Sequence, residues 1–347
     1  MTESAPAAGY ENLGLVVIGR NEGKRLVRCL ASVRSAPKRV YVDSGSTDGS
    51  VEHALSVGVT VVELEVPPKF TAARARNAGL VRLIADNPRL EFVQTVDGDC
   101  EINQAWIPAA LAALRAEPDL AAVYGRLRER FPERSIYNAL CDDDWNVPVG
   151  EAPIVGGIAL FRVSALRQVD FYDPTMIAGE EPDMAMRMRK CGWRLRRIDA
   201  EMGYHDADIT RFAQWWKRTR RTGHAYAELA FRHPDARQPN WRHTTHSIVF
   251  WGGVMPLVLV SAVALALFAS LYWWFIAGLV LLAWPVHVLQ IALRKLRAGL
   301  SGKFAAASGG LLMIGKVPQL LGFIEYHLNR LVGRTSRLIE HKGPAGS

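Results

Sequence analysis

The fold is decided by residues 14–64, which read GLVVIGRNEGKRLVRCLASVRSAPKRVYVDSGSTDGSVEHALSVGVTVVEL. Apolar runs rich in β-branched residues recur three times in this stretch, at residues 14–19, 39–43 and 59–64. Segments whose apolar residues have helical spacing separate these runs, at residues 22–35 and 49–57. Alternation of short buried strands with helices predicts a mostly parallel sheet with helices on both faces.

The same alternation continues downstream, where we expect a helix over residues 72–86 and a strand over 92–96. The chain has 347 residues, 49% of them hydrophobic and 22% charged, which is typical of one or two folded domains and not of a disordered protein. Its formal net charge of +8 suits an anionic substrate or an anionic membrane surface as well as it suits nucleic acid. The four cysteines lie far apart with no C-x-x-C pair, which argues against a zinc ribbon and indicates a reducing compartment.

Polar clusters follow three of the predicted strands. They are Arg20-Asn-Glu22, Asp43-Ser-Gly-Ser-Thr-Asp48 and Asp97-Gly-Asp99. In sheets of this kind ligands bind beyond the carboxyl ends of the strands. Two carboxylates at i and i+2 can share a divalent cation with phosphate oxygens. The sequence contains neither a P-loop nor a G-x-G-x-x-G fingerprint after a strand, which disfavours a P-loop nucleotidase and a dinucleotide dehydrogenase.

These clusters belong to an ordered series of short motifs. The series runs Val17-Ile-Gly-Arg-Asn-Glu22, Val42-Asp-Ser-Gly-Ser-Thr-Asp-Gly49, Ala73-Arg-Ala-Arg-Asn-Ala-Gly79, Asp97-Gly-Asp99, Gly156-Gly157 and Gly179-Glu-Glu-Pro-Asp183. In order and spacing it resembles the family 2 glycosyltransferases of the GT-A fold, over residues 12–225. The resemblance implies a Rossmann-like, mostly parallel open sheet, a nucleotide-diphosphate sugar donor (in the first place a UDP-sugar), Mg²⁺ or Mn²⁺, and inversion at the anomeric carbon.

Residue by residue, the resemblance also implies a donor site and a catalytic base. The residues implied to bind the nucleotide sugar are Arg20, Asn21, Glu22, Asp43, Arg74, Asn77, Asp97, Gly156 and Gly157. Among them Asp43 is expected to read the base and Asp97 to approach the ribose, while Asp99 is expected to ligate the metal. Glu181 lies where the family places its catalytic base. Many relatives have Glu-Asp there, and because this chain has Glu180-Glu181, Glu180 is the alternative.

Residues 204–221 contain a histidine and a basic run. His205 could complete the metal site, as a histidine does in some GT-A enzymes, or be a structural residue at a strand end. A second group is predicted to bind the phosphates of a lipid acceptor or anionic headgroups; it comprises Trp215, Arg218, Arg220 and Arg221. A solvated basic helix face is the alternative interpretation of this group.

The chain becomes strongly apolar after residue 247. Two uncharged stretches, 248–269 and 271–293, would each form a helix about 33–35 Å long, enough to cross a ~30 Å hydrocarbon core. Basic residues flank both outer ends, which favours a hairpin with both ends in the cytoplasm; buried helices of a soluble protein are the alternative. The segment 294–347 mixes apolar and basic residues, so we expect it to lie on the membrane surface or to pack on the catalytic domain.

These patterns predict five regions along the chain: a flexible N-terminus (1–10), a GT-A domain (11–225), an interfacial linker (226–247), a transmembrane hairpin (248–293) and an amphipathic, basic C-terminal segment (294–347). The first residues contain no basic stretch followed by an apolar one, so we expect no secretory signal. The expected location is therefore a bacterial inner membrane, crossed more than once, with the catalytic domain in the cytoplasm.

The function predicted is sugar transfer onto a polyprenyl-diphosphate-linked saccharide in surface glycan or exopolysaccharide synthesis. One alternative is a polyprenyl-phosphate sugar synthase, in which the lipid phosphate is itself the acceptor. A processive synthase is disfavoured because it usually needs more spans. A non-catalytic membrane scaffold is disfavoured because Asp99 and Glu181 are intact, and nucleic-acid binding because no recognition motif is found.

Overall fold

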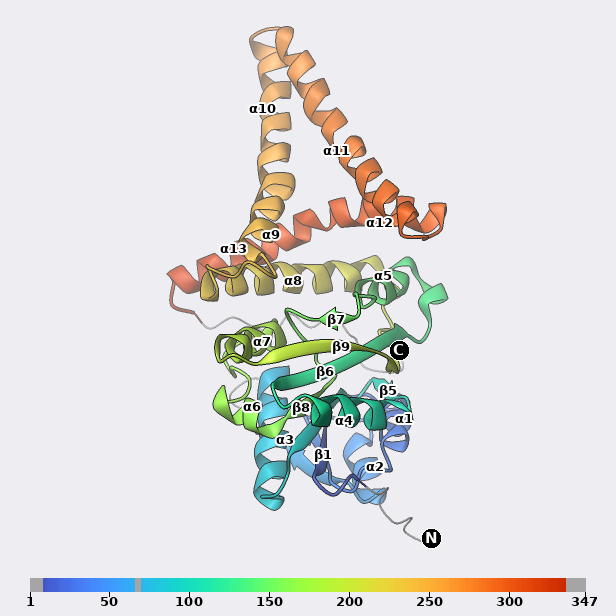
Figure 1. The fold of residues 1–347 in the computed structure, drawn as a ribbon. Coiled ribbons are helices and arrows are strands. Elements are labelled where there is room, and N and C mark those ends of the chain that lie inside the picture. Colours follow the sequence, from blue (N-terminus) through green and yellow to red (C-terminus); the bar gives the residue numbers. More distant parts are fainter. Residues whose placement is uncertain (1–8, 66–69, 335–347) are drawn as a thin grey trace. The chain divides into compact units, whose positions relative to one another are not determined.

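The computed structural model describes residues 9–65 and 70–334 (Figure 1). The expected flexible N-terminus (all but its last two residues) and the end of the C-terminal segment lie outside these residues. The chain divides into two compact units, which we describe separately. Within the described residues the first unit comprises 9–132 and 141–209, and the second comprises 133–140 and 210–334.

The first unit is built on one mixed sheet. Its nine strands, within the part of the chain described, are β1 (Leu13–Gly19), β2 (Arg39–Asp43), β3 (Thr60–Glu63), β4 (Phe92–Asp97), β5 (Cys100–Ile102), β6 (Leu120–Glu129), β7 (Gly150–Glu151), β8 (Ala159–Arg162) and β9 (Arg194–His205). They are ordered β3-β2-β1-β4-β8-β6-β9-β5, and β7 pairs with β9. The predicted strands at 14–19, 39–43, 59–64 and 92–96 are therefore confirmed.

Strand direction explains why the sheet is mixed. The pairs β1–β2, β2–β3, β1–β4 and β6–β9 are parallel. Strand β8 is antiparallel to both β4 and β6, and β5 and β7 are antiparallel to β9. Strands β1, β2, β3, β4, β6 and β9 consequently share one direction, as the prediction of a mostly parallel sheet requires. Their carboxyl ends lie along one edge.

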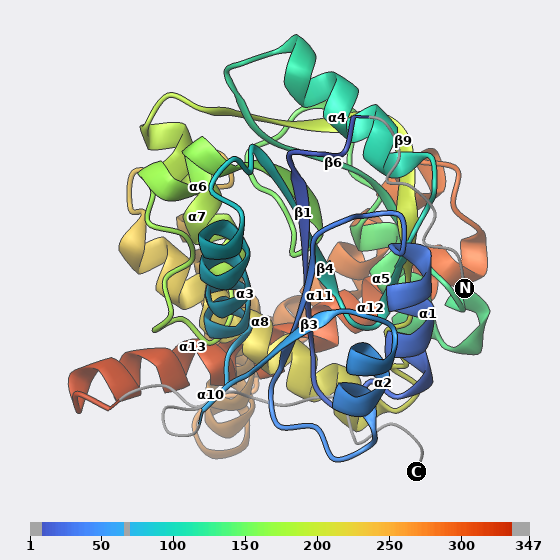
Figure 2. The same cartoon turned by 90° about the horizontal axis from the view of Figure 1, so that it is seen from below.

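Helices cover both faces of this sheet. The helices of the unit are α1 (Lys24–Ser32), α2 (Ser50–Ser56), α3 (Ala72–Asp86), α4 (Trp106–Ala116), α6 (Val163–Gln168) and α7 (Glu180–Lys190). The residues of the short η1 (Pro132–Arg134) and of α5 (Ile136–Asp144) are divided between the two units. Alternate residues of β1 point to opposite faces: Leu15 and Val17 join a core with α1, α2 and α4, whereas Val16 and Ile18 join a core with α3, α6 and α7. Figure 2 shows α3, α6 and α7 on one side of β1 and α1 and α2 on the other.

The second unit is helical and largely apolar. It contains α8 (Phe212–Arg232), α9 (Trp241–Val249), the π-helical turn η2 (Phe250–Val254), α10 (Met255–Phe268), α11 (Tyr272–Arg297), α12 (Gly302–Ile314) and α13 (Lys316–Leu331). Helices α10 and α11 form the predicted hairpin (Figure 1). Large apolar side chains such as Phe268 and Leu271 are exposed at its turn. Both helices present apolar side chains outward, as a lipid-facing hairpin requires.

Three helical stretches of the described chain are long and apolar enough to cross a membrane: Trp241–Phe268, Tyr272–Arg297 and Gly302–Leu331. This number exceeds the two predicted spans. The third stretch comprises α12 and α13, which run across the base of the hairpin and not alongside it (Figures 1 and 2). Its mixture of apolar and basic residues predicts an amphipathic segment, and its position on the membrane surface stays a prediction. The three helices indicate association with a membrane.

Candidate functional site

The sequence motifs meet at the carboxyl edge of the sheet. Strand register places Gly19 beside Asp43 and Ile18 beside Asp97, so the ends of β1, β2 and β4 are level. The chain then crosses from β4 to β5 through Gly98, whose backbone N–H donates to the Ile18 carbonyl at 2.8 Å. This link brings Asp99 from the centre of the sheet towards β9, because β5 pairs with β9 and not with β4.

Arg76 of α3 is the centre of a buried charge network at this edge. Its guanidinium lies 2.9 Å from carboxylate oxygens of Asp97, Glu180 and Glu181, and its side chain is 2% exposed. Burial alone would lower the pKa of Arg76, but the surrounding negative charges of Asp97 and Glu181 raise it well above the ordinary value. One permanently charged side chain therefore holds together three carboxylates that would otherwise repel one another.

Gly157 leaves the space that this network needs. A Cβ atom at Gly157 would lie 2.2 Å from Nη2 of Arg76 and 3.0 Å from Oε1 of Glu181, whereas one at Gly156 would meet nothing within 4 Å. The Gly157 carbonyl accepts a hydrogen bond from Thr95 Oγ1 at 2.8 Å, which fixes the loop against β4. Gly157 is thus required by Arg76 in this structure, while Gly156 faces open space.

Burial distinguishes the two glutamates at the start of α7. The side chain of Glu180 is 3% exposed and that of Glu181 is 18% exposed. Burial and the neighbouring charge of Glu180 raise the pKa of Glu181 to about 7, against the opposing effect of Arg76. A partly accessible carboxylate with a pKa near neutrality matches the requirement for a general base better than a fully buried one does.

Asp43 is held by its own turn. Tyr41 donates its hydroxyl to Asp43 Oδ1 at 2.8 Å, and the backbone N–H groups of Gly45 and Ser46 donate to Oδ2 at 2.8 and 2.7 Å. Asn21, at φ 53°, accepts from the Thr47 N–H at 2.8 Å and so fixes the loop after β1 to the loop after β2. The two polar loops predicted from the sequence therefore form one structure.

The other residues implied to bind the nucleotide sugar make different kinds of contact within the protein. Glu22 forms an ion pair with Arg25 at 2.9 Å, and Arg20 lies over the Phe70 ring. Asn77 exchanges two hydrogen bonds with the backbone of Tyr172, at 2.7 and 3.1 Å, so its amide is used to join α3 to the loop before α7. Arg74 donates to the Glu65 carbonyl at 3.3 Å and is partly exposed.

His205 lies between two carboxylates, that of Asp99, directly before β5, and that of Glu129 at the end of β6. Its Nε2 is 3.3 Å from Asp99 Oδ2, and its Nδ1 is 3.3 Å from Glu129 Oε2. Asp99, Cys100 and His205 together form a group of side chains close enough to hold a metal ion. The thiol of Cys100 is an unsuitable ligand for Mg²⁺ or Mn²⁺, because burial and nearby carboxylates raise its pKa and these ions prefer oxygen.

The residues present fit the divalent cation that the fold family uses. The Asp99 carboxylate and the His205 Nε2 face one another, and two protein ligands would leave the other coordination positions to diphosphate oxygens and water. An imidazole beside a carboxylate suits Mn²⁺ at least as well as Mg²⁺. The predicted metal residues are therefore brought together in the structure.

The sequence analysis gives no role to two polar residues of this edge, although one of them, Arg76, lies within the motif of residues 73–79. Arg76 could have been found from helical spacing, because it lies in the buried stripe of α3 with Ala73, Leu80 and Leu83, where an arginine signals a buried ion pair. Glu129 has no comparable signal. It reaches His205 only through the pairing of β6 with β9.

The predicted acceptor residues all lie in the second unit, on α8. Trp215 is buried and stacks on Tyr137, with ring centroids 5.7 Å apart. Arg220 forms an ion pair with Glu325 of α13 at 2.8 Å. Arg218 and Arg221 are partly exposed. The structure thus assigns two of the four residues to packing within the unit.

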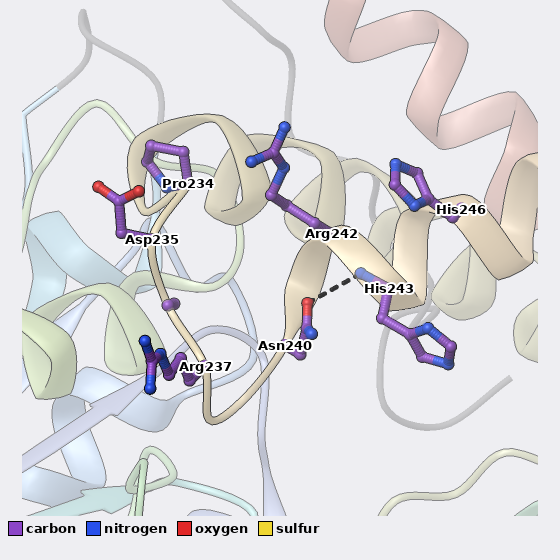
Figure 3. Close-up of a pocket in the computed structure, with 8 residues that line it drawn as sticks. Pro234, Asp235, Arg237, Asn240, Arg242, His243 and His246 are labelled. Atoms are coloured by element: carbon purple, nitrogen blue, oxygen red, sulfur yellow. Dashed lines mark hydrogen bonds between the residues drawn. The ribbon is translucent and has the colours of Figure 1, made fainter.

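A pocket of about 460 Å³ lies in the same unit, at the start of α9 (Figure 3). It is lined by Pro234, Asp235, Ala236, Arg237, Asn240, Arg242, His243 and His246. Asn240 caps the helix by accepting from the His243 N–H at 3.0 Å. Two arginines and two histidines against one carboxylate make this pocket basic, and it lies in the stretch predicted to be an interfacial linker.

Comparison with known proteins agrees with the motifs. Residues 15–170 match glycosyl transferase family 2, and residues 142–293 match glycosyl transferase family group 2. The two matches together span residues 15–293, so most of the chain consists of glycosyl transferase family 2 domains. Its fold is that of GT-A enzymes: a mannosyltransferase from Pyrobaculum calidifontis, solved in complex with GDP-Man and Mn²⁺, superposes with a TM-score of 0.61 at 18% identity, over 92% of this chain and 88% of that one.

Each curated relative matches this chain over only part of its own length. The pre-mycofactocin glycosyltransferases of two Mycobacterium tuberculosis strains, CDC 1551 and H37Rv, are 29% identical over 266 residues, which is 73% of this chain and 53% of theirs. A TPR repeat-containing protein of Synechococcus elongatus is 28% identical over 177 residues, 43% of this chain and 42% of its own. This chain thus spans about half the length of the curated relatives it matches.

Proposed function

We propose that the protein is an inverting, metal-dependent glycosyltransferase that moves a sugar from a nucleotide-diphosphate donor to a lipid-linked acceptor at a membrane surface. The observation that carries the proposal is the joint placement of Asp97, Asp99 and Glu181 at one sheet edge, with Arg76 and His205 as their partners. The GDP-Man and Mn²⁺ bound to the Pyrobaculum calidifontis mannosyltransferase support a nucleotide-sugar donor and a metal.

The donor would bind along the strand ends. Asp43 and Asn21 form the polar rim proposed to recognise the base, and Asp97, whose side chain is 34% exposed, can accept hydrogen bonds from the ribose. The backbone at Gly156 can approach the donor sugar because no Cβ intervenes. A uridine nucleotide remains the first donor to test.

Glu181 is proposed to be the catalytic base. It would take the proton from the acceptor hydroxyl as that oxygen forms a bond to the anomeric carbon, on the face opposite to the departing diphosphate. Attack from the opposite face breaks the bond between the anomeric carbon and the diphosphate oxygen and inverts the configuration. Both glutamates contact Arg76 at 2.9 Å, and the lower exposure of the Glu180 side chain, 3% against 18% for Glu181, supports Glu181 for this role.

Asp99 and His205 would hold the divalent cation. When bound there, the ion supplies positive charge that stabilises the negative charge developing on the leaving nucleoside diphosphate. Asp99 is almost completely buried, which increases the strength of its interaction with a cation in that position.

A membrane-held acceptor is supported by the apolar helices and by two basic surfaces in the second unit. The first surface is the α8 pair Arg218 and Arg221, and the second is the basic pocket of Figure 3. Guanidinium groups bind phosphate oxygens through paired donors. We place the acceptor phosphates on the α8 pair. A polyprenyl-phosphate acceptor, as opposed to a lipid-diphosphate saccharide for surface glycan synthesis, is the alternative within this proposal.

The test is transfer of radiolabelled sugar from a panel of nucleotide sugars into a lipid-extractable product, with purified protein in vesicles. We expect labelled lipid to form with one donor and with Mn²⁺ or Mg²⁺ present. The Arg218→Ala/Arg221→Ala variant should show a raised KM for the lipid acceptor, and the matched Arg237→Ala/Arg242→Ala variant should not. If the Arg237→Ala/Arg242→Ala variant alone has a raised KM for the lipid acceptor, the acceptor phosphates bind in the pocket of Figure 3. Label found only in water-soluble products would contradict a lipid acceptor.

A further inference from the structure

Glu129 has no place in the donor site or in base catalysis, yet it is a buried carboxylate beside the candidate metal ligands. Its side chain is 0% exposed, and burial of a charged group is costly unless that group is paired and hydrogen-bonded. Its oxygens accept the Ala207 N–H at 3.2 and 3.3 Å and lie 3.3 Å from His205 Nδ1.

The sheet itself places these side chains in one row. Strand β9 lies between β5 and β6, and His205 is paired in register with Cys100 on one side and with Glu129 on the other. Two backbone hydrogen bonds hold the row at this level: Asp206 N–H donates to the Asp99 carbonyl at 3.0 Å, and Arg130 N–H donates to the His205 carbonyl at 2.8 Å. The position of Glu129 beside His205 is thus fixed by strand pairing.

The two ring nitrogens of His205 consequently face different carboxylates. With Glu129 accepting a hydrogen bond from Nδ1–H, the other nitrogen, Nε2, keeps its lone pair on the side of Asp99. The Trp145 ring packs edge-on against the imidazole, with centroids 4.7 Å apart, and restricts rotation of the ring. Metal-binding histidines are commonly oriented in this way by a carboxylate on the second nitrogen.

We propose that Glu129 is a positioning residue of the metal site: it holds the His205 ring so that Nε2 faces an ion bound at Asp99. The inference rests on the proposed metal-dependent function and deepens it. Glu129 would also fix the backbone after His205 through Ala207, which keeps the strand end and the ring together.

The experiment measures Mn²⁺ alone, with the full chain in detergent, by electron paramagnetic resonance. Titration gives the dissociation constant, and pulsed spectra report coupling between Mn²⁺ and a bound nitrogen. We expect nitrogen coupling in the wild type and its loss in His205→Gln. Glu129→Gln should weaken Mn²⁺ binding about 10–100-fold. The matched control Glu201→Gln, which removes an exposed carboxylate from β9, the strand of His205, should bind Mn²⁺ like the wild type.

The double variant separates positioning from simple loss of charge. If Glu129 acts through His205, adding Glu129→Gln to the His205→Gln variant should change the dissociation constant for Mn²⁺ little further. An equal loss in both backgrounds, or unchanged binding in Glu129→Gln, would overturn the inference. Wild-type spectra without nitrogen coupling would overturn it even if Glu129→Gln failed to fold. Absence of any Mn²⁺ binding by the wild type would instead contradict the proposed metal-dependent function.

Discussion

Glu181 illustrates how the surroundings of one side chain define its chemistry. It shares a guanidinium with Glu180 and Asp97, but it is the more accessible of the two glutamates. Since burial and Glu180 raise its pKa to about 7, Glu181 is protonated below neutrality and becomes a competent base as the pH rises through that value.

We predict that Glu181→Gln lowers kcat by about 10²–10⁴ while donor binding is retained, because the base is lost and the shape is kept. The wild-type kcat should rise with pH through about 7, and this rise should be absent in Glu181→Gln. Steady-state transfer assays between pH 5.5 and 8.5 measure both effects. If Glu180→Gln is the inactive variant and Glu181→Gln is active, the base is Glu180.

Gly157 and Gly156 provide a matched pair of substitutions. Ala at 157 would force its Cβ against Arg76, which three carboxylates hold in place, whereas Ala at 156 meets open space. We expect Gly157→Ala to lose about 1–3 kcal/mol of stability through overpacking, and Gly156→Ala to be neutral or slightly stabilising. Thermal unfolding of both variants tests this, and equal midpoints would show that Arg76 is free to move aside.

At the scale of elements, the first half of the sheet is predictable from sequence and the second half is much less so. Strands β1 to β4 alternate with α1, α2 and α3 and carry local apolar periodicity, so their positions follow from short windows. Strands β5, β6, β8 and β9 pair across long sequence separations, and their order depends on contacts that no short window encodes.

The same distinction applies to the site. Asp43, Asp97 and Asp99 follow predicted strands, so their convergence on one edge could be predicted from direction alone. Glu129 could not be placed beside His205 because their proximity comes from the β6–β9 register, across 76 residues. Asn77 is a motif residue that is expected to line the nucleotide. Its amide makes two hydrogen bonds to the backbone of Tyr172, and this contact was not predictable from the motif.

Helices α8 and α13 of the second unit pack closely against one another. A Cβ at Gly322 would lie 2.0 Å from the Arg220 carbonyl, and one at Gly223 would lie 2.0 Å from the Gln319 carbonyl. The two glycines therefore let the backbones touch, as small residues do where membrane helices cross.

We expect Gly322→Ala to destabilise this crossing by about 1–3 kcal/mol, because the obstacle is backbone and cannot rotate away. Gly310→Ala on α12, where a Cβ meets nothing within 4 Å, is the control and should be neutral or stabilising, since Ala favours helix. Thermal unfolding in detergent compares the two variants. A Gly322→Ala protein as stable as Gly310→Ala would contradict the close crossing.

For the whole molecule, the helices α9 to α13 predict how the protein is held at a membrane. Three stretches long and apolar enough to cross it should resist conditions that remove peripheral proteins. We predict that high salt and alkaline carbonate leave the full chain in the membrane pellet and that detergent releases it, because salt screens headgroup attraction but does not expose buried apolar helices. Release by salt alone would exclude the membrane-spanning arrangement.

Metal-dependent sugar transfer can be measured as release of nucleoside diphosphate from a panel of nucleotide sugars, with and without Mn²⁺ or Mg²⁺, by the wild type and by Asp99→Asn. The substitution removes one metal carboxylate and keeps the shape of the side chain. We expect the wild type to release nucleoside diphosphate from one class of donor when metal is present and to lose that activity in excess chelator. We expect no release by Asp99→Asn, with or without metal. Undiminished release in chelator, or by Asp99→Asn, would contradict the proposal of a metal-dependent glycosyltransferase.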